Sequence, residues 1–232
     1  MKYFIVGDIH GCYDELTALI DSLFINKAED VVIFVGDYFD RGPKSYEVWK
    51  YIDELKSKLK DRCVLLRGNH EQMLVDCYKY SDDTWFYNGH KATLNSFEAN
   101  NVDIKDVMHW ILNNTVYYYK NDLFTVVHAG RVADKVENDK IDTLIWDRAC
   151  LRYADFDKDI TFAGHTPLDF PIITLNFSGK KLEYDKPFNL PEKGMIGIDT
   201  ACVYGYKLTA AIIDSDTRIV TLKNVESTQQ KE

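Results

Sequence analysis

Three short segments of the sequence combine carboxylate, imidazole and amide side chains with glycine, and each follows an apolar run. They read GDIHG at residues 7–11, GDYFDRG at residues 36–42 and GNHE at residues 68–71. Carboxylate, imidazole and amide oxygen together suit divalent metals such as manganese, iron or zinc. Glycine permits tight turns and a close approach of the backbone. The three segments therefore predict a metal site that is built from loops.

Individual side chains in these segments have the chemistry of metal ligands. Asp8 and His10 are two residues apart, so they would share one face if strand geometry continued through them. Asp37 carries two oxygens that could bridge a pair of ions about 3.5–4 Å apart, a spacing at which two metals can clamp a phosphoryl group. Asn69 adds an amide oxygen, so all three segments offer ligands.

Histidines and arginines elsewhere extend this set. His128 and His165 each follow an apolar run and stand near a glycine, so both are candidate ligands. Phosphate also needs cationic donors, and a guanidinium group can grip phosphate oxygens in a bidentate manner. Arg41, inside the second segment, and Arg148 are the candidates for this contact.

An acid–base pair stands beside the predicted ligands. His70 directly follows Asn69 and could protonate the leaving oxygen of a phosphate ester. Asp40 could hold the tautomer of His70 and raise its basicity, as carboxylates do for catalytic histidines. The sequence therefore offers both metal ligands and a proton donor.

Alternating strand-like and helix-like segments must position these residues. The first 66 residues follow a βαβαβ pattern, which favours parallel strands with crossover helices. In such a sheet the carboxyl ends of the strands line one crevice, so each strand would deliver its ligands to the same edge. Helices are expected at residues 13–24, 44–59, 71–80, 83–86, 91–97 and 103–113. Strands are expected at residues 3–6, 31–35, 63–66, 116–119, 123–127, 160–162, 172–175, 195–198, 207–213 and 218–222.

Composition and charge restrict the class of protein. The chain has 232 residues, of which 46% are hydrophobic, so we expect one α/β domain over residues 1–226 and a frayed tail at residues 227–232. A net charge of −9 disfavours duplex nucleic acid as a partner. The sequence contains no run of about 18 apolar residues, which a membrane-spanning helix would need. Five widely spaced cysteines without a CxxC pair predict reduced thiols and a cytoplasmic location.

The three segments and the two later histidines resemble the calcineurin-like metallophosphoesterases, whose pattern is GDxHG, then GDxxDRG, then GNHE. Within that family the sequence is most similar to bacterial and phage serine/threonine protein phosphatases of the PPP type. The resemblance extends over roughly residues 1–213. It also includes Trp85, Thr93, the block 145–148 and Asp199.

The resemblance implies a fold, a cofactor and a set of roles. The fold is a four-layer α/β/β/α sandwich of two mixed sheets flanked by helices. The cofactor is a pair of divalent ions, with Mn²⁺ favoured over iron, zinc, cobalt or nickel. The two ions share Asp37 and are bound by Asp8, His10 and Asp37, and by Asp37, Asn69, His128 and His165. The acid pair is His70 and Asp40, and the phosphate ligands are Arg41 and Arg148.

The implied reaction is hydrolysis of phosphoserine or phosphothreonine in proteins, by attack of a hydroxide bound to the two metals. The same scaffold and motifs also serve symmetrical dinucleoside tetraphosphate (Ap4A-type) hydrolases, which the block 198–211 resembles as well. His90, Ala201 and Tyr206 replace glycines that are common in relatives, and these departures leave the substrate open between a phosphoprotein or phosphopeptide and a nucleotide polyphosphate.

Two other classes fit the sequence less well. A catalytically silent phosphoprotein-binding scaffold would not need the proton donor that His70 and Asp40 provide. A dinucleotide-binding dehydrogenase would share the βαβ opening, but the first strand is not followed by the GxGxxG pattern. A metal-dependent phosphoesterase is therefore the preferred interpretation.

Overall fold

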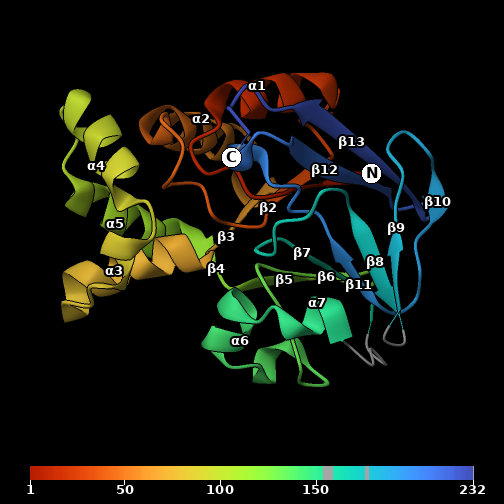
Figure 1. The fold of residues 1–232 in the computed structure, drawn as a ribbon. Coiled ribbons are helices and arrows are strands. Elements are labelled where there is room, and N and C mark those ends of the chain that lie inside the picture. The colour runs from red at the N-terminus through yellow and green to blue at the C-terminus, as the bar shows by residue number, and fades with distance from the viewer. Residues whose placement is uncertain (154–158, 176–177, 232) are drawn as a thin grey trace.

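Two mixed β-sheets pack against each other, and helices cover the outer face of each sheet (Figure 1). The structure is a computed structural model that describes residues 1–153, 159–175 and 178–231. Separate buried apolar clusters lie between the sheets and between each sheet and its helices. This arrangement confirms the expected four-layer α/β/β/α sandwich.

The first sheet contains the strands that precede the three ligand segments. Its strand order is β10-β13-β12-β1-β2-β3-β4. The strands are β1 (Lys2–Val6), β2 (Val31–Phe34), β3 (Cys63–Leu66), β4 (Thr115–Val116), β10 (Phe188–Asn189), β12 (Lys207–Asp214) and β13 (Ile219–Glu226). Strands β1 to β4 run parallel, so their carboxyl ends meet at one edge, as the βαβαβ pattern predicts.

The second sheet has the strand order β5-β6-β7-β11-β8-β9. Its strands are β5 (Tyr118–Lys120), β6 (Thr125–Val127), β7 (Thr161–Ala163), β8 (Ile172–Leu175), β9 (Ser178–Lys181) and β11 (Met195–Gly197). Strands β6, β7 and β11 are parallel to one another. Strands β5 and β6, which follow each other in the chain, pair in antiparallel register as a hairpin.

One predicted strand is wrong. The sequence favours a single strand over residues 116–119, but Val116 pairs with the first sheet and Tyr118 with the second. The chain crosses between the sheets at Tyr117. Val116 in β4 and Tyr118 in β5 are both typical strand residues, and residue type alone does not show which sheet a residue joins.

The central strand β1 shows why the first sheet is stable. Phe4 and Val6 belong to the cluster under the helices, whereas Tyr3 and Ile5 belong to the cluster between the sheets. A strand that is buried on both faces is apolar throughout, and residues 3–6 are. Fully burying one such large apolar side chain contributes roughly 1.5–3 kcal/mol, so β1 is a rigid support for the segment that follows it.

The helices are α1 (Tyr13–Ser22), α2 (Ser45–Leu59), α3 (Asn69–Tyr80), α4 (His90–Ala99), α5 (Ile104–Asn114), α6 (Ile141–Trp146) and α7 (Ala149–Tyr153). Short 3-10 helices are η1 (Lys60–Arg62), η2 (Thr84–Tyr87), η3 (Val136–Asn138) and η4 (Cys202–Tyr204). Helices α1 and α2 lie over the first sheet, and α3, α4 and α5 form a lobe beside it (Figure 1). The sequence did not predict α6 and α7, which are too short to show a helical period. In the described residues, no helix combines the length and apolar character of a membrane span.

The end of the chain differs from the expected frayed tail. After β13, the backbone N–H and the hydroxyl of Thr228 both donate to Glu15 Oε1, each at 2.7 Å. The backbone N–H of Ser227 donates to the carbonyl of Tyr206 at 2.8 Å. Residues 227–231 therefore lie against helix α1 and the loop before β12, because a buried carboxylate accepts their polar groups.

Candidate metal centre

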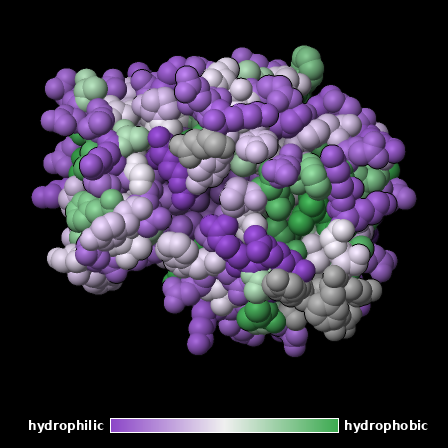
Figure 2. All heavy atoms as spheres, in the orientation of Figure 1, coloured by the Kyte–Doolittle hydropathy of each residue, from purple (hydrophilic) through white to green (hydrophobic). Residues whose placement is uncertain are grey.

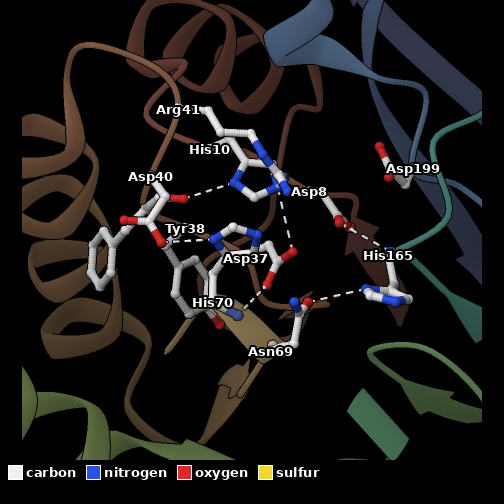
Figure 3. A network of polar contacts seen from close by, with 12 residues as sticks. Asp8, His10, Asp37, Tyr38, Asp40, Arg41, Asn69, His70, His165 and Asp199 are labelled. Atoms are coloured by element: carbon white, nitrogen blue, oxygen red, sulfur yellow. Dashed lines mark hydrogen bonds and ion pairs between the residues drawn. The ribbon is translucent and has the colours of Figure 1, made fainter. Parts of the chain in front are cut away.

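The loops that follow β1, β2 and β3 meet the loops that follow β6 and β7 at one edge of the sandwich (Figure 3). All six predicted metal ligands are buried there, together with the predicted acid His70. They are Asp8, His10, Asp37, Asn69, His128 and His165. The structure thus brings together ligands that are up to 157 positions apart in the chain.

Asp37 lies between two groups of ligand atoms. His10 Nε2 is 3.4 Å from Asp37 Oδ2, and His128 Nε2 is 3.4 Å from Asp37 Oδ1. The ligand atoms of His10, Asp37 and His70 lie within 4.8 Å of one another, as do those of Asp37, His128 and His165. Asp37 is common to both groups, which is the arrangement that a bridging carboxylate needs. His70, expected as the acid, stands in the first group.

Neighbouring backbone atoms orient the histidine rings. His10 Nδ1 donates to the carbonyl of Phe39 at 2.7 Å, and His128 Nδ1 donates to the carbonyl of Val35 at 2.9 Å. These bonds leave each Nε2 atom unprotonated, as a ligand nitrogen must be, because a neutral imidazole has one protonated nitrogen. His128 Nε2 and His165 Nδ1 both lie 3.0 Å from Asn69 Oδ1, so one amide oxygen and two ring nitrogens converge.

The carboxylates are crowded in a way that favours bound cations. Asp8 Oδ2 accepts the backbone N–H of His165 at 3.0 Å, whereas Asp8 Oδ1 is buried and has no hydrogen-bond partner among the described residues. Burial, with repulsion from Asp199, holds the pKa of Asp8 well above its usual value. Buried polar atoms are normally partnered, and divalent ions would satisfy this oxygen and offset the repulsion. The residues present therefore fit a pair of dications.

The turns that carry these ligands adopt left-handed backbone conformations. The φ angles are +46° at His10, +53° at Asp37 and +63° at His165. Such conformations cost roughly 1–2 kcal/mol per non-glycine residue, and they collect at functional sites. The expectation that strand geometry aligns Asp8 with His10 is wrong, because β1 ends at Val6 and a turn aims the His10 ring.

Two glycines are required by close contacts with carboxylates. A Cβ atom on Gly164 would overlap with Asp8 Oδ1, and a Cβ atom on Gly68 would overlap with Asp37 Oδ1. Both glycines stand next to a predicted ligand in the sequence. Each glycine leaves space for a carboxylate from a distant segment. The sequence alone shows only that the glycine stands beside a histidine or an asparagine.

The two residues that we predict as the acid pair lie in contact. His70 Nδ1 lies 2.7 Å from Asp40 Oδ2, and Asp40 is fully buried. The carboxylate of Asp40 also accepts the indole N–H of Trp85 at 2.8 Å and the hydroxyl of Thr93 at 2.6 Å. His70 Nε2 is buried without a hydrogen-bond partner in the described part of the chain. Burial lowers the pKa of His70, and Asp37 and Asp40 offset part of that effect.

Sequence reasoning missed the role of Glu71. Its carboxylate accepts the backbone N–H groups of Asp37 at 2.8 Å, Tyr38 at 2.9 Å and Gly68 at 3.0 Å. Burial, aided by Asp37, raises the pKa of Glu71 to about 8. Glu71 thus connects the loops after β2 and β3. The only sequence signal for this role was the position of Glu71 in the third segment. A carboxylate that accepts hydrogen bonds from the backbone can stand at any spacing from the residues it contacts.

Asp199 was noted only as part of the resemblance, yet it belongs to the site. It lies two residues beyond the end of β11, is 6% exposed and lines the cavity of the metal centre. The strand-end argument that identified the other ligands would have found it. Burial raises the pKa of Asp199, while its bond from the backbone N–H of Ala201 and nearby His10 act in the opposite direction.

The two arginines line the same cavity. Arg41 Nη1 lies 2.5 Å from His10 Nε2, and Arg148 is exposed. The departures from the family pattern lie at three different places. Ala201 lines the cavity with a left-handed φ of +57°, whereas the His90 ring packs 5.0 Å from that of Phe86. Tyr206 contacts the C-terminal segment instead.

Comparisons with known proteins agree with this geometry. Residues 1–187 match the family model described as calcineurin-like phosphoesterase. The chain is 31% identical over 233 residues to an asymmetrical bis(5'-nucleosyl)-tetraphosphatase, PrpE, of Bacillus subtilis, covering 90% of this chain and 89% of that relative. It is 30% identical over 132 residues to a symmetrical bis(5'-nucleosyl)-tetraphosphatase of Buchnera aphidicola, covering 57% of this chain and 42% of that protein. The chain thus spans less than half the length of the Buchnera relative.

A solved structure shares the fold at low identity. A protein serine/threonine phosphatase of Saccharomyces cerevisiae matches with a TM-score of 0.66 and 14% identity, over all of this chain and 82% of the other. At this identity the likeness supports the fold only. The family match covers most of the sequence and contains the segments that form the buried ligand cluster. This protein belongs to the calcineurin-like phosphoesterase family, a family of phosphate-ester hydrolases.

Proposed function

We propose that this protein holds two divalent metals on its six buried ligands and hydrolyses phosphate esters or anhydrides. The observation that supports this most directly is the convergence of ligand atoms on both oxygens of Asp37, beside the unpartnered Asp8 Oδ1. When bound, the two ions would lower the pKa of water and neutralise charge on the phosphoryl group. The mixed oxygen and nitrogen ligands suit Mn²⁺, our first choice, and also iron, zinc, cobalt or nickel.

The protein's own side chains would carry the remaining steps. Arg41 and Arg148 would bind the non-bridging phosphate oxygens, because guanidinium groups match their geometry. His70 Nε2 would donate a proton to the leaving oxygen. Asp40, through its 2.7 Å contact, would keep the other ring nitrogen protonated and fix the plane of the ring.

A dinucleoside polyphosphate is the substrate that we place first. The Bacillus relative that matches along nearly the whole chain is named as a tetraphosphatase that acts on such molecules. A phosphoprotein, to which the sequence motifs first point, is the second candidate and is supported by the PPP-type pattern of the three segments. We retain a cytoplasmic location as part of the proposal, in keeping with five cysteines that are all free thiols.

The test compares three substrates with Mn²⁺-loaded protein at equal concentration: diadenosine tetraphosphate, a phosphothreonine peptide and p-nitrophenyl phosphate. Nucleotide products are separated by anion-exchange chromatography, and phosphate release is followed for the other two. We expect the dinucleotide to turn over fastest. Faster turnover of the peptide would favour the phosphoprotein candidate. Tight Mn²⁺ binding with hydrolysis of none of the three would overturn the proposal in favour of a silent binding protein.

A further inference from the structure

A groove runs beside the metal centre along the C-terminal segment. Arg41, Val203 and Tyr204 line both the cavity of the metal centre and this groove, so the two spaces adjoin each other. The cavity has a volume of about 30 Å³, whereas the groove has a volume of about 690 Å³. The cavity therefore accommodates little more than a phosphoryl group, and the groove is large enough for the rest of a substrate.

The outer wall of the groove is formed by the end of the chain. Gln229 and Lys231 line it, and they follow the two hydrogen bonds from Thr228 to Glu15. The Lys231 amine lies 5.0 Å from the centre of the Tyr206 ring. Figure 2 shows hydrophilic surface around this end of the chain, between the helical lobe and the sheets. Hydrogen bonds to Glu15 and the contact between Lys231 and Tyr206 therefore fix the end of the chain against the fold.

The charge of the groove is opposite to that of the whole chain. The chain carries a net charge of −9, yet the described residues that line the groove include Arg41 and Lys231 and no carboxylate. A polyanion that enters the metal centre would meet cations along this path. The groove is therefore suited to further phosphates beyond the one that reacts.

Two aromatic rings provide the other feature. Tyr87, at the end of η2, is 81% exposed and lines the groove. Tyr204 lies on the side of the metal centre, where its ring centre is 5.7 Å from the Arg41 guanidinium carbon. Exposed aromatic rings beside a cationic path are suited to stacking with nucleic-acid bases, since every base has a π face.

We propose that this groove binds the nucleoside and outer phosphates of a nucleoside polyphosphate whose reacting phosphorus lies at the metal centre. The proposal rests on the proposed hydrolytic function and names its specificity site. Tyr87 stacks on a base, and Lys231 contacts the outer phosphates. An acidic phosphopeptide would use Lys231 but would gain little from an exposed ring, so the combination favours a nucleotide.

The test measures KM and kcat of Tyr87→Ala and Lys231→Ala in the full-length, Mn²⁺-loaded protein. For diadenosine tetraphosphate we expect KM to rise about tenfold in Tyr87→Ala, because one stacked base is lost. We expect a smaller rise in Lys231→Ala, and Tyr87→Phe should retain the wild-type KM. For p-nitrophenyl phosphate, which does not reach the groove, both alanine variants should match the wild type.

Matched controls are available on the same molecule. Tyr80 is 72% exposed at the end of α3 and does not line the groove, so Tyr80→Ala should leave every constant unchanged. Lys186, whose side chain is 70% exposed in a surface pair with Glu183, serves the same purpose for Lys231. An equal effect of the control variants would attribute the change to general surface properties and overturn the proposal.

The outcomes separate this inference from the proposed function. An unchanged KM for the dinucleotide in both groove variants would overturn the inference while hydrolysis stands. A raised KM for the phosphothreonine peptide alone would also overturn it and assign the groove to peptides. Calorimetric binding of ATP tests the groove without catalysis. Weaker ATP binding to Tyr87→Ala would support it even if the wild type hydrolysed nothing, and equal binding would overturn it.

Discussion

The floor of the site and its rim differ in burial and in how their side chains are held. The floor consists of the six proposed metal ligands with His70 and Asp40, and all are buried. The rim consists of Arg148, Tyr87 and Lys231, which are exposed, with the partly buried Arg41 and Tyr204. On the floor, backbone carbonyls and N–H groups orient the donor atoms. A fixed floor determines the reaction, and an accessible rim can determine the substrate.

The largest effect should come from the centre of the floor. Asp37→Asn removes charge from the carboxylate common to both ligand groups. We expect loss of hydrolysis of every substrate, and a loss of Mn²⁺ affinity beyond the 10–100-fold typical when a group that only orients a ligand is removed. Calorimetric titration with Mn²⁺ and activity assays measure both quantities. Near-normal Mn²⁺ affinity would show that Asp37 does not bridge.

His70→Asn should distinguish proton donation by His70 from metal binding by His70. We expect kcat for a phosphate ester with a poor leaving group to fall by about 10²–10⁴-fold, because proton donation is lost. For p-nitrophenyl phosphate, which needs no proton on its leaving group, the fall should be much smaller. His109→Asn, on the exposed side of α5, is the control. Equal losses with both esters would assign His70 to metal binding, in line with its place near His10 and Asp37.

Gly164→Ala tests how tightly the floor is packed. The new Cβ would overlap with Asp8 Oδ1, so Asp8 must move. We expect at least a tenfold loss of Mn²⁺ affinity, in the range seen when the orientation of a ligand is disturbed. In Gly179→Ala, the added Cβ finds its nearest neighbour, Thr174 Oγ1, at 3.9 Å, so this variant should behave as wild type. Similar metal affinity in the two variants would contradict a rigid floor.

Arg148→Ala should lower kcat/KM moderately, because we propose that Arg148 binds the substrate phosphate. Hydrogen bonds to charged groups contribute about 1.5–3 kcal/mol, which corresponds to a loss in kcat/KM of roughly 10–100-fold. Mn²⁺ affinity should not change, because Arg148 stands on the rim. Arg152→Ala, an exposed arginine on α7, is the control. Unchanged kcat/KM in Arg148→Ala would leave Arg41 as the arginine that binds phosphate.

The smallest expected effect is on the free energy of unfolding, through Glu15, which binds the C-terminal segment that lines the groove. Burial raises the pKa of Glu15, but the hydrogen bonds from Thr228 outweigh burial and hold it below its usual value. Because the pKa is lowered on folding, Glu15 stabilises the fold above about pH 4.3 and progressively less as the pH falls. Glu15→Gln should cost about 1 kcal/mol in urea unfolding at pH 7, and the difference should shrink as the pH is lowered through the range in which Glu15 becomes protonated. The exposed Glu98→Gln is the control, and a pH-independent difference would exclude this ionic contact.

Much of the floor could be predicted because its residues stand beside strand ends. The three segments with glycine gave Asp8, Asp37 and Asn69, and the apolar runs gave the positions of His128 and His165. The same physical rule places Asp199 just beyond the end of β11. The resemblance to the family implied the four-layer arrangement, whereas the βαβαβ order by itself predicted parallel strands with crossover helices on their faces.

Tertiary structure decided what depends on contacts between distant segments. The sequence could not show that Glu71 binds the backbone of two loops, that Gly164 leaves space for Asp8, or that Val116 and Tyr118 join different sheets. The packing of residues 227–231 against Glu15 also joins opposite ends of the chain. Local residue types and spacing thus determined the chemistry that we propose, because the donor atoms that a residue offers are a property of its side chain. Only the packed fold determined the orientation of the side chains, their burial and the shape of the groove, because these depend on which distant segments pack around each side chain.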